Sequence, residues 1–344
     1  MASEKNNGPV HFSIVATEET TPTAMYGMYE ILSSVGVAWP LLTKGSRGTP
    51  LFEVSIVSAD GKPFSTAGGI PVAPHHAVHD VEFSDVVVVT DIDLPLEIDP
   101  CTAWPELAGW LRQQHARGAT LCSVCTGGVV LARAGLLDGL DATTHWSATG
   151  IISECFPNVV LRPERIIQPA GPEHRIITAG GASAWQDLLL YLIARFASED
   201  EARNAAKIFL LGDRSEGQLP FAAMAAPRNH QDGAIAGCQT WVADHYDDAN
   251  PVAAMTELSG LNERTFKRRF RKATGYSPID YVQALRIEEA KHLLETTDLP
   301  TDLVGREVGY EEPAFFRRLF RRRTGTTPAR YRQRFRTVMR AQQA

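Results

Sequence analysis

A repeated segment in the last third of this 344-residue chain constrains its fold more than any other feature. The stretch from Gly260 to Phe270, GLNERTFKRRF, recurs from Gly309 to Phe320 as GYEEPAFFRRLF. With one residue inserted in the second turn, the aromatic, basic, glycine and proline positions of the two copies correspond at a constant offset of 50 residues. A short helix, a turn that contains glycine and a second helix form the helix-turn-helix pattern. The sequence therefore predicts two such units.

The second helix of each unit is expected to bury one face and to expose a basic face. Phe266 and Phe270, like Phe316 and Phe320, lie four residues apart, so both rings point to the same side of a helix. Arginine and lysine occupy the opposite side, and such a helix can enter the major groove, where arginine binds guanine. Two solvated amphipathic helices would show the same charge, but the repetition of the whole pattern favours DNA binding.

Charge is distributed unevenly along the chain. The net charge is −6, yet the part from Arg228 onward holds 20 basic and 15 acidic residues, a net of +5. Residues 1–227 hold 14 basic and 25 acidic residues, a net of −11. A basic last third attached to an acidic body predicts that only the last third contacts a polyanion.

Residues 234–335 resemble the AraC-type DNA-binding domain, in which a long helix, here Pro278 to about Glu295, joins two helix-turn-helix units. The stretch GREVGYEEPAFFRRLFRRRTGTTPARYR, from Gly305 to Arg332, carries the resemblance. The resemblance implies double-stranded DNA as the partner. It also places Pro313 and Ala314 of the second unit at base-facing positions, although their side chains have no hydrogen-bond donors. The predicted DNA-binding residues are Glu263, Arg264, Lys267, Arg268 and Arg271 in the first unit, and Arg317, Arg318, Arg321 and Arg322 in the second.

Short apolar segments alternate with helical patterns over the first two hundred residues. Strands are expected at 10–16, 52–58, 85–90, 120–124 and 175–179, and helices at 24–35, 104–117, 129–136 and 185–196. This alternation predicts an α/β fold with a doubly wound, mostly parallel sheet, followed by an all-α domain with the two helix-turn-helix units.

The segment SVCTGG places Cys125 where a strand turns sharply into a helix. The helix N-terminus is expected to lower the pKa of this thiol and to give a reactive thiolate. Residues 10–211 resemble the class I glutamine amidotransferase-like domain of the DJ-1/PfpI superfamily, in the form that is fused to AraC-type regulators; SVCTGG, AGLLDG and TTHW carry the resemblance. The predicted effector-binding residues are Cys125, Thr126, His145, Trp146, Trp185 and Asp187.

An alternative function is a cysteine-dependent hydrolase or hydratase in which Cys125 is the nucleophile and His145 its base. Two departures from the superfamily pattern favour a binding site without catalysis. Thr126 stands where hydrolases of the superfamily often carry histidine, and Ala24 stands where many members carry a carboxylate. An architectural DNA binder is a third class, but it would not need a two-hundred-residue domain with a binding site.

Five cysteines in a chain of this length fit reduced thiols in a cytosol better than a disulfide framework, and the pair Cys122 and Cys125 is not expected to be bonded. The triplet His75, His76 and His79 lies in a loop without acidic or thiol ligands at suitable spacing, so no metal and no cofactor are expected. The sequence also shows neither a long apolar segment nor a secretory signal.

The sequence therefore predicts an effector-controlled transcription regulator in the cytoplasm. Its expected parts are an effector-sensing and dimerising domain at 1–211, a linker at 212–233 and a DNA-binding domain at 234–344. The expected partners are double-stranded DNA, a small-molecule effector, RNA polymerase and a second copy of the chain, with no membrane.

Overall fold

The computed structural model describes residues 8–340 except 67, 95–97, 212–218 and 220–229. The chain divides into two compact units, Met1–Gln218 and Leu219–Ala344, here called the α/β unit and the helical unit. Most of the expected linker at 212–233 falls on residues that the structure does not describe. Among the described residues, no helix combines the length and the apolar character needed to cross a lipid bilayer.

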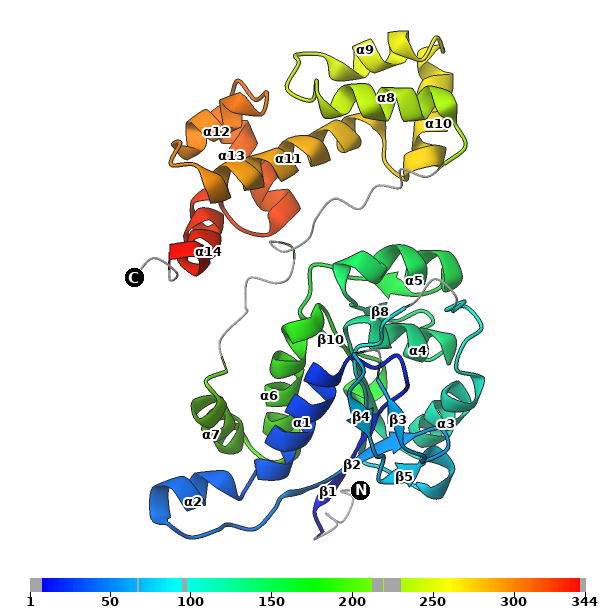
Figure 1. Cartoon of the computed structure of the whole chain (residues 1–344), viewed down its shortest axis with the longest axis vertical. Coiled ribbons are helices and arrows are strands. Elements are labelled where there is room, and N and C mark those ends of the chain that lie inside the picture. The colour runs from blue at the N-terminus through cyan, green and yellow to red at the C-terminus, as the bar shows by residue number, and fades with distance from the viewer. Residues whose placement is uncertain (1–7, 67, 95–97, 212–218, 220–229, 341–344) are drawn as a thin grey trace. The chain divides into compact units, whose positions relative to one another are not determined.

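A seven-stranded sheet forms the centre of the α/β unit (Figure 1), in the order β10-β11-β7-β6-β1-β2-β5. All its neighbours pair in parallel except β10 with β11. Its strands are β1 (Val10–Val15), β2 (Phe52–Ser58), β5 (His76–Ala77), β6 (Val86–Val89), β7 (Thr120–Val124), β10 (Ile167–Ala170) and β11 (Ile176–Ala179). The short pairs β3 (Phe64–Ser65) with β4 (Pro71–Val72), and β8 (Asp141–Ala142) with β9 (Val160–Leu161), lie outside it.

Helices cover both faces of the sheet, as the alternation of strand and helix patterns predicted. One core packs the sheet against α1 (Pro22–Ser34), α6 (Trp185–Phe196) and α7 (Glu199–Phe209). The other packs it against α3 (Pro105–Ala116) and α4 (Gly128–Arg133). The sequence patterns did not anticipate α2 (Ala38–Lys44), α5 (Thr149–Cys155) or α7. The predicted doubly wound α/β fold is confirmed.

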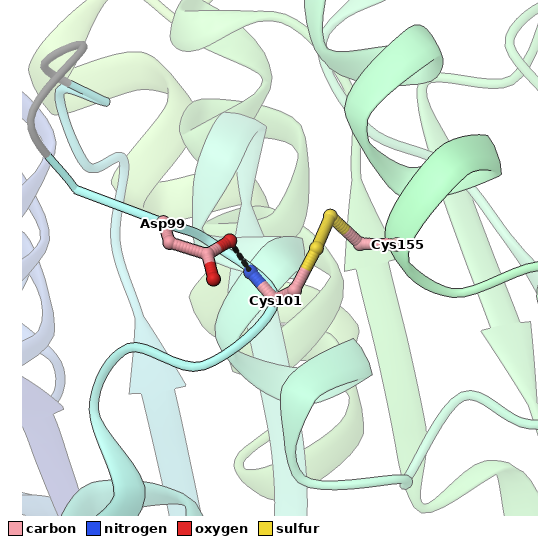
Figure 2. Close-up of side chains that lie close together, drawn as sticks. All are labelled: Asp99, Cys101 and Cys155. Atoms are coloured by element: carbon pink, nitrogen blue, oxygen red, sulfur yellow. Dashed lines mark hydrogen bonds between the residues drawn. A yellow bond between two sulfur atoms is a disulfide. The ribbon is translucent and has the colours of Figure 1, made fainter.

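A disulfide joins Cys101 to Cys155 across a separation of 54 residues (Figure 2). The expectation that all cysteines are reduced was therefore wrong. Cys101 lies in the loop before α3 and Cys155 ends α5, so sequence distance gave no sign that their Cα atoms are 5.2 Å apart, which is within reach of a disulfide. Cys122, Cys125 and Cys238 are free and buried.

Asp99 lies beside this disulfide, and these three residues bring potential metal-ligand atoms within 4.8 Å of one another (Figure 2). Both sulfurs are already bonded to each other, and a metal binds thiolate sulfur. The Asp99 carboxylate accepts hydrogen bonds from the backbone N–H of Cys101 and from the hydroxyl of Thr102. The cluster is therefore a disulfide beside a loop that Asp99 stabilises by hydrogen bonds, and it is not a metal site.

The helical unit consists, in its described part, of α8 (Gly233–Ala243), α9 (Pro251–Leu258), α10 (Glu263–Thr274), α11 (Pro278–Thr296), α12 (Thr301–Glu307), α13 (Pro313–Thr324) and α14 (Pro328–Arg340). Two aromatic cores lie side by side in it. Tyr281 and Val282 of α11 belong to the first core, whereas Ile287, Ala290 and Leu294 belong to the second. One helix therefore holds both halves together, as expected for the helix from Pro278 to about Glu295.

Candidate functional site

The helices α9 and α10 form the first helix-turn-helix. Gly260 turns the chain between them with a φ of +64°, a conformation that glycine adopts without strain. Asn262 then caps α10 by accepting a hydrogen bond from the backbone N–H of Thr265 at 3.0 Å. Phe266 and Phe270 are completely buried, so the opposite side of α10 must face outward.

The helices α12 and α13 repeat this arrangement in the second unit. Phe316 and Phe320 are completely buried, and Gly305 of α12 packs so closely that a Cβ added there would lie 2.8 Å from the Phe316 ring. Even a small polar detail is repeated: the hydroxyls of Thr274 and Thr324 donate to the carbonyl four residues earlier, both at 2.8 Å. The sequence repeat therefore corresponds to a repeat of structure.

The nine residues predicted to bind DNA are all exposed, and each lies on α10 or α13. Two of them form ion pairs within the unit: Lys267 with Glu263 at 2.5 Å, and Arg317 with Asp302. Six arginines form neither an ion pair nor a side-chain hydrogen bond with any described residue, and their charge is directed to solvent. They are Arg264, Arg268 and Arg271 on α10, and Arg318, Arg321 and Arg322 on α13.

Two further arginines of the same helices have a structural role instead. Arg269 donates two hydrogen bonds to the carboxylate of Asp232 at 2.7 and 2.8 Å, which attaches α10 to the start of α8. Arg323 pairs with Asp280 at 2.7 Å and so attaches α13 to α11. The guanidinium fork suits the two-point contact that Arg269 makes with its carboxylate. Position around the helix axis separates these arginines from the six that face outward.

Sequence reasoning missed Arg286, which joins the two helix-turn-helix units. This side chain is only 9% exposed and donates to three backbone carbonyls, those of Tyr246 (2.6 Å), Asp248 (2.7 Å) and Gly309 (2.8 Å). A Cβ at residue 309 would lie 2.9 Å from the guanidinium carbon, and the φ of +83° there also favours glycine. Arg286 therefore fixes the turn of the second unit against the loop between α8 and α9.

The elbow at Cys125 forms the second candidate site, at the end of β7. Cys125 has a φ of +55°, which is strained for a residue with a side chain. The elbow also presses against β6, because a Cβ at Gly127 would lie 2.3 Å from the carbonyl oxygen of Thr90. The predicted strand, sharp turn and helix are all present.

The thiol of Cys125 differs from the prediction. Burial, together with the negative charge of Asp91, raises its pKa to about 11, although hydrogen bonds from Thr126 act in the other direction. Cys125 is 7% exposed. The expectation of a thiolate near neutral pH was therefore wrong, because the loss of hydration outweighs the effect of the helix N-terminus.

The remaining predicted site residues serve several local roles. Thr126 binds the loop after β6, donating to the carbonyl of Ile92 at 2.5 Å and accepting from its N–H at 2.8 Å. Thr144 donates to the carbonyl of Cys125 at 2.8 Å, which brings the segment with His145 and Trp146 to the elbow. His145 itself bonds through Nδ1 to Ser147, and burial lowers its pKa.

Trp185 and Asp187 lie in the first turn of α6. Trp185 is 9% exposed and packs against α1, where a Cβ at Gly27 would lie 2.8 Å from its ring. Trp185 therefore belongs to the same core as Cys125, and Asp187 is half-buried beside it in the chain. In the histidine loop, His75 has a structural role, since its Nδ1 accepts from the backbone N–H of Ile56 at 2.9 Å.

Sequence reasoning also missed Asp91, two residues beyond the end of β6. The residue is 8% exposed, its Oδ1 has no hydrogen-bond partner among the described residues, and burial raises its pKa to about 6. The available signal was an acidic residue directly after the apolar run VVVVT, where the carboxyl end of a parallel strand was expected.

Comparisons with known proteins agree with both halves of this description. A helix-turn-helix domain profile matches residues 255–334, and a DJ-1/PfpI family profile matches residues 47–194. The transcriptional regulator CdhR of Pseudomonas aeruginosa is 30% identical over 88% of this chain and 88% of its own length. The transcriptional regulator GlxA of Rhizobium meliloti is 27% identical over 83% of this chain and 87% of its own length.

The chain belongs to the AraC family of helix-turn-helix transcriptional regulators with an N-terminal DJ-1/PfpI domain. The helical unit is therefore a DNA-binding unit. A more distant similarity covers the α/β unit: the isonitrile hydratase of Pseudomonas putida is 27% identical over 52% of this chain and 68% of its own length. The family assignment confirms the two resemblances that the repeat and the cysteine elbow carried.

Proposed function

We propose that this AraC-family protein is a sequence-specific regulator whose DNA binding responds to a small-molecule effector in the α/β unit. The effector site comprises the edge of the sheet around Cys125, Thr126, His145, Trp146, Trp185 and Asp187. The observation that supports sequence-specific binding is the pair of recognition helices. Each is anchored by buried phenylalanines, and each exposes three arginines that form no ion pair with any described residue.

Guanine recognition follows from the chemistry of these arginines. Each guanidinium can donate two parallel hydrogen bonds to guanine O6 and N7, while the other basic groups and the helix N-termini contact phosphates. The two recognition helices are expected to enter successive major-groove segments about 34 Å apart. A homodimer formed through the α/β unit would then contact four segments, and we propose that it meets RNA polymerase in the cytoplasm.

Regulation requires that the effector binds one arrangement of the protein more tightly than the other. In this proposal, residues 1–211 sense the effector, 212–233 connect the two parts and 234–344 bind DNA. Two observations support a site for binding rather than catalysis. Cys125 has a pKa raised to about 11, and Nδ1 of His145 is already bonded to Ser147.

The test is operator binding by the full-length protein. Operator fragments are first selected from genomic DNA, and their affinity is measured by fluorescence anisotropy for Arg268→Ala, Arg318→Ala and the unsubstituted chain. Each substitution is expected to weaken specific binding by about 1–3 kcal/mol and to relax preference at one base pair. Arg203→Ala is the matched control, because Arg203 is exposed and pairs with acidic residues of α7 in the other unit. Unchanged affinity of both α10 and α13 variants would contradict the groove assignment.

The alternative function is a thiol hydrolase or hydratase, which the similarity to isonitrile hydratase favours. It predicts turnover that requires Cys125. Cys125→Ser should leave the effector response of DNA binding largely intact if the site only binds, because serine nearly preserves the size and hydrogen bonding of the thiol. The same change should abolish a measurable turnover if the protein is an enzyme.

A further inference from the structure

The strand order of the sheet reverses between β1 and β6. The chain proceeds from β1 to β2 on one side, and β6 returns to pair with the other side of β1. Open α/β sheets bind ligands outside the carboxyl ends of the two strands that flank such a switch point. Here those ends lead into Thr17–Thr21 and Thr90–Asp93, next to the elbow after β7.

Backbone contacts hold these two loops together. The N–H of Thr21 donates to the carbonyl of Asp91 at 3.0 Å, and the N–H of Asp93 donates to the carbonyl of Glu19 at 2.7 Å. Thr20 and Ile92 form an isolated β-bridge between the same loops. Because Thr126 also binds Ile92, three consecutive strand ends are joined into one rigid rim. The backbone that carries the rim side chains is therefore held in place before any ligand arrives.

Buried oxygen atoms without a protein partner collect at this rim. Most buried side-chain oxygens in proteins are hydrogen bonded, so each exception needs an explanation. Of nine such buried nitrogen or oxygen atoms among the described residues, five come from the ends of β1, β6 and β7 or the loops that follow them. They are Oγ1 of Thr17, Thr21 and Thr90, Oγ of Ser123 and Oδ1 of Asp91.

Asp91 is the charged member of this set. It is more than nine-tenths buried, and no cationic side chain acts on it among the described residues. An isolated carboxylate is costly to bury, so such a group takes up a proton or pairs with a cation. Its elevated pKa, about 6, agrees with this reasoning and still leaves it ionised at neutral pH.

We infer that Asp91 is the anchor for an effector that carries a primary ammonium group. The inference rests on the effector site proposed above and names the chemical class that it accepts. An ammonium group has three N–H donors, of which the carboxylate takes one, and the neighbouring threonine hydroxyls can accept the others. A neutral alcohol could donate one hydrogen bond but would leave the buried charge uncompensated.

A divalent metal ion fits this rim less well than an ammonium group. Calcium takes six to eight oxygen ligands, commonly with several carboxylates among them. At this rim only Asp91 contributes a buried carboxylate without a partner, and the other unpartnered atoms are neutral hydroxyls. No group of metal-ligand side chains is found there among the described residues.

Four small probes test the inference on the full-length protein: ethylammonium chloride, tetramethylammonium chloride, ethanol and magnesium chloride, each at the same ionic strength with potassium chloride as reference. Binding is measured by saturation-transfer NMR and by the melting temperature from tryptophan fluorescence. Ethylammonium should bind at least tenfold more tightly than ethanol or tetramethylammonium, because only ethylammonium offers both charge and N–H donors. Magnesium should have no specific effect.

Asp91→Asn should reduce ethylammonium binding at least tenfold, whereas Asp93→Asn, the matched control in the exposed part of the same loop, should leave it unchanged. Thr21→Val should weaken it partially, and this variant keeps the inference testable if Asp91→Asn does not fold. Equal binding of ethanol or tetramethylammonium, an effect of magnesium larger than that of ethylammonium, or full binding by Asp91→Asn would each overturn the inference.

Failure of the proposed function would appear differently. If ethylammonium binds through Asp91 but no metabolite with an ammonium group changes operator affinity, then the site is present and effector control is wrong. If a neutral metabolite controls operator affinity equally well in Asp91→Asn, then effector control stands and the ammonium inference is wrong.

Discussion

The two units of this protein treat buried charge in opposite ways. In the helical unit, the guanidinium of Arg286 is buried and has three carbonyl partners. In the α/β unit, the carboxylate of Asp91 is buried with no partner for one of its oxygens. A satisfied buried charge rigidifies a structure, whereas an unsatisfied one lowers its stability unless a ligand supplies the partner. The buried charge of Arg286 therefore stabilises the arrangement of the helical unit, whereas the buried charge of Asp91 makes the stability of the α/β unit depend on a partner.

The largest expected difference between the two units comes from the disulfide, because both of its cysteines lie in the α/β unit. Reduction should lower the stability of that unit by about 4 kcal/mol, the loop entropy expected for a crosslink between residues 54 apart. Urea unfolding with and without dithiothreitol, followed by tryptophan fluorescence, measures the change, since five of the six tryptophans lie in the α/β unit.

A Cys101→Ser/Cys155→Ser double variant should unfold like the reduced protein and should not respond to dithiothreitol. Operator affinity is the matched readout for the helical unit and should not change on reduction. If the reductant changes operator affinity but not the stability of the α/β unit, then the disulfide does not act on that unit alone and the contrast between the two units is wrong.

Arg286→Met should destabilise the helical unit by about 3 kcal/mol, because it removes the three hydrogen bonds of a buried guanidinium. Arg286→Lys should recover only part of this loss, since an ammonium group cannot reproduce the geometry of the planar fork. Fluorescence of Trp241, measured on variants with the other tryptophans replaced by phenylalanine, follows the unfolding. Exposed Arg306 of α12 supplies the control, and Arg306→Met should be neutral.

Asp91→Asn should stabilise the α/β unit by about 1–3 kcal/mol at pH 8. The folded pKa of about 6 lies above the usual value of 3.8, so the native state binds the proton more tightly than the unfolded state. Stability therefore falls as pH rises from about 4 to 6, and the cost is complete above pH 6. The gain from the substitution should shrink to about half at pH 5. Urea titrations at both pH values measure it, and an equal gain at both would show that charge is not the cause.

The smallest expected effect is at Cys125, whose thiol should be nearly inert at neutral pH. Because its pKa is about 11, its alkylation by iodoacetamide should be more than tenfold slower at pH 7.5 than that of a free thiol, and should keep rising up to pH 10. Mass spectrometry of the peptide that contains Cys125 gives the rate. A plateau near pH 7 would indicate an activated nucleophile and would favour the hydratase alternative.

Local patterns were sufficient to predict most of the elements. The strand over residues 120–124 and the helix over 185–196 agree with the structure at both ends, because each has uniform apolar or amphipathic character. The repeat predicted both helix-turn-helix units for the same reason: its signal lies within short segments. The short helix α5 lacked such a signal and was missed.

Features that depend on contacts between distant segments could not be predicted in this way. The Cys101–Cys155 bond, the three carbonyls around Arg286 and the burial of Asp91 each join residues that are far apart in sequence or from different loops. The prediction of the pKa shift of Cys125 failed for a related reason, since the sequence indicates the helix N-terminus but not the depth at which the thiol is buried.

The shared helix α11 has a consequence for the operator. Its residues are part of both aromatic cores, and Arg286 attaches the second turn to the first unit. The two recognition helices are therefore held at a fixed separation and orientation. Inserting five base pairs between the two contacted segments would rotate one of them to the far side of the duplex. The rigid connection between the two recognition helices cannot follow this rotation. The number of base pairs between the contacted segments should therefore be as strictly selected in the operators as the bases themselves.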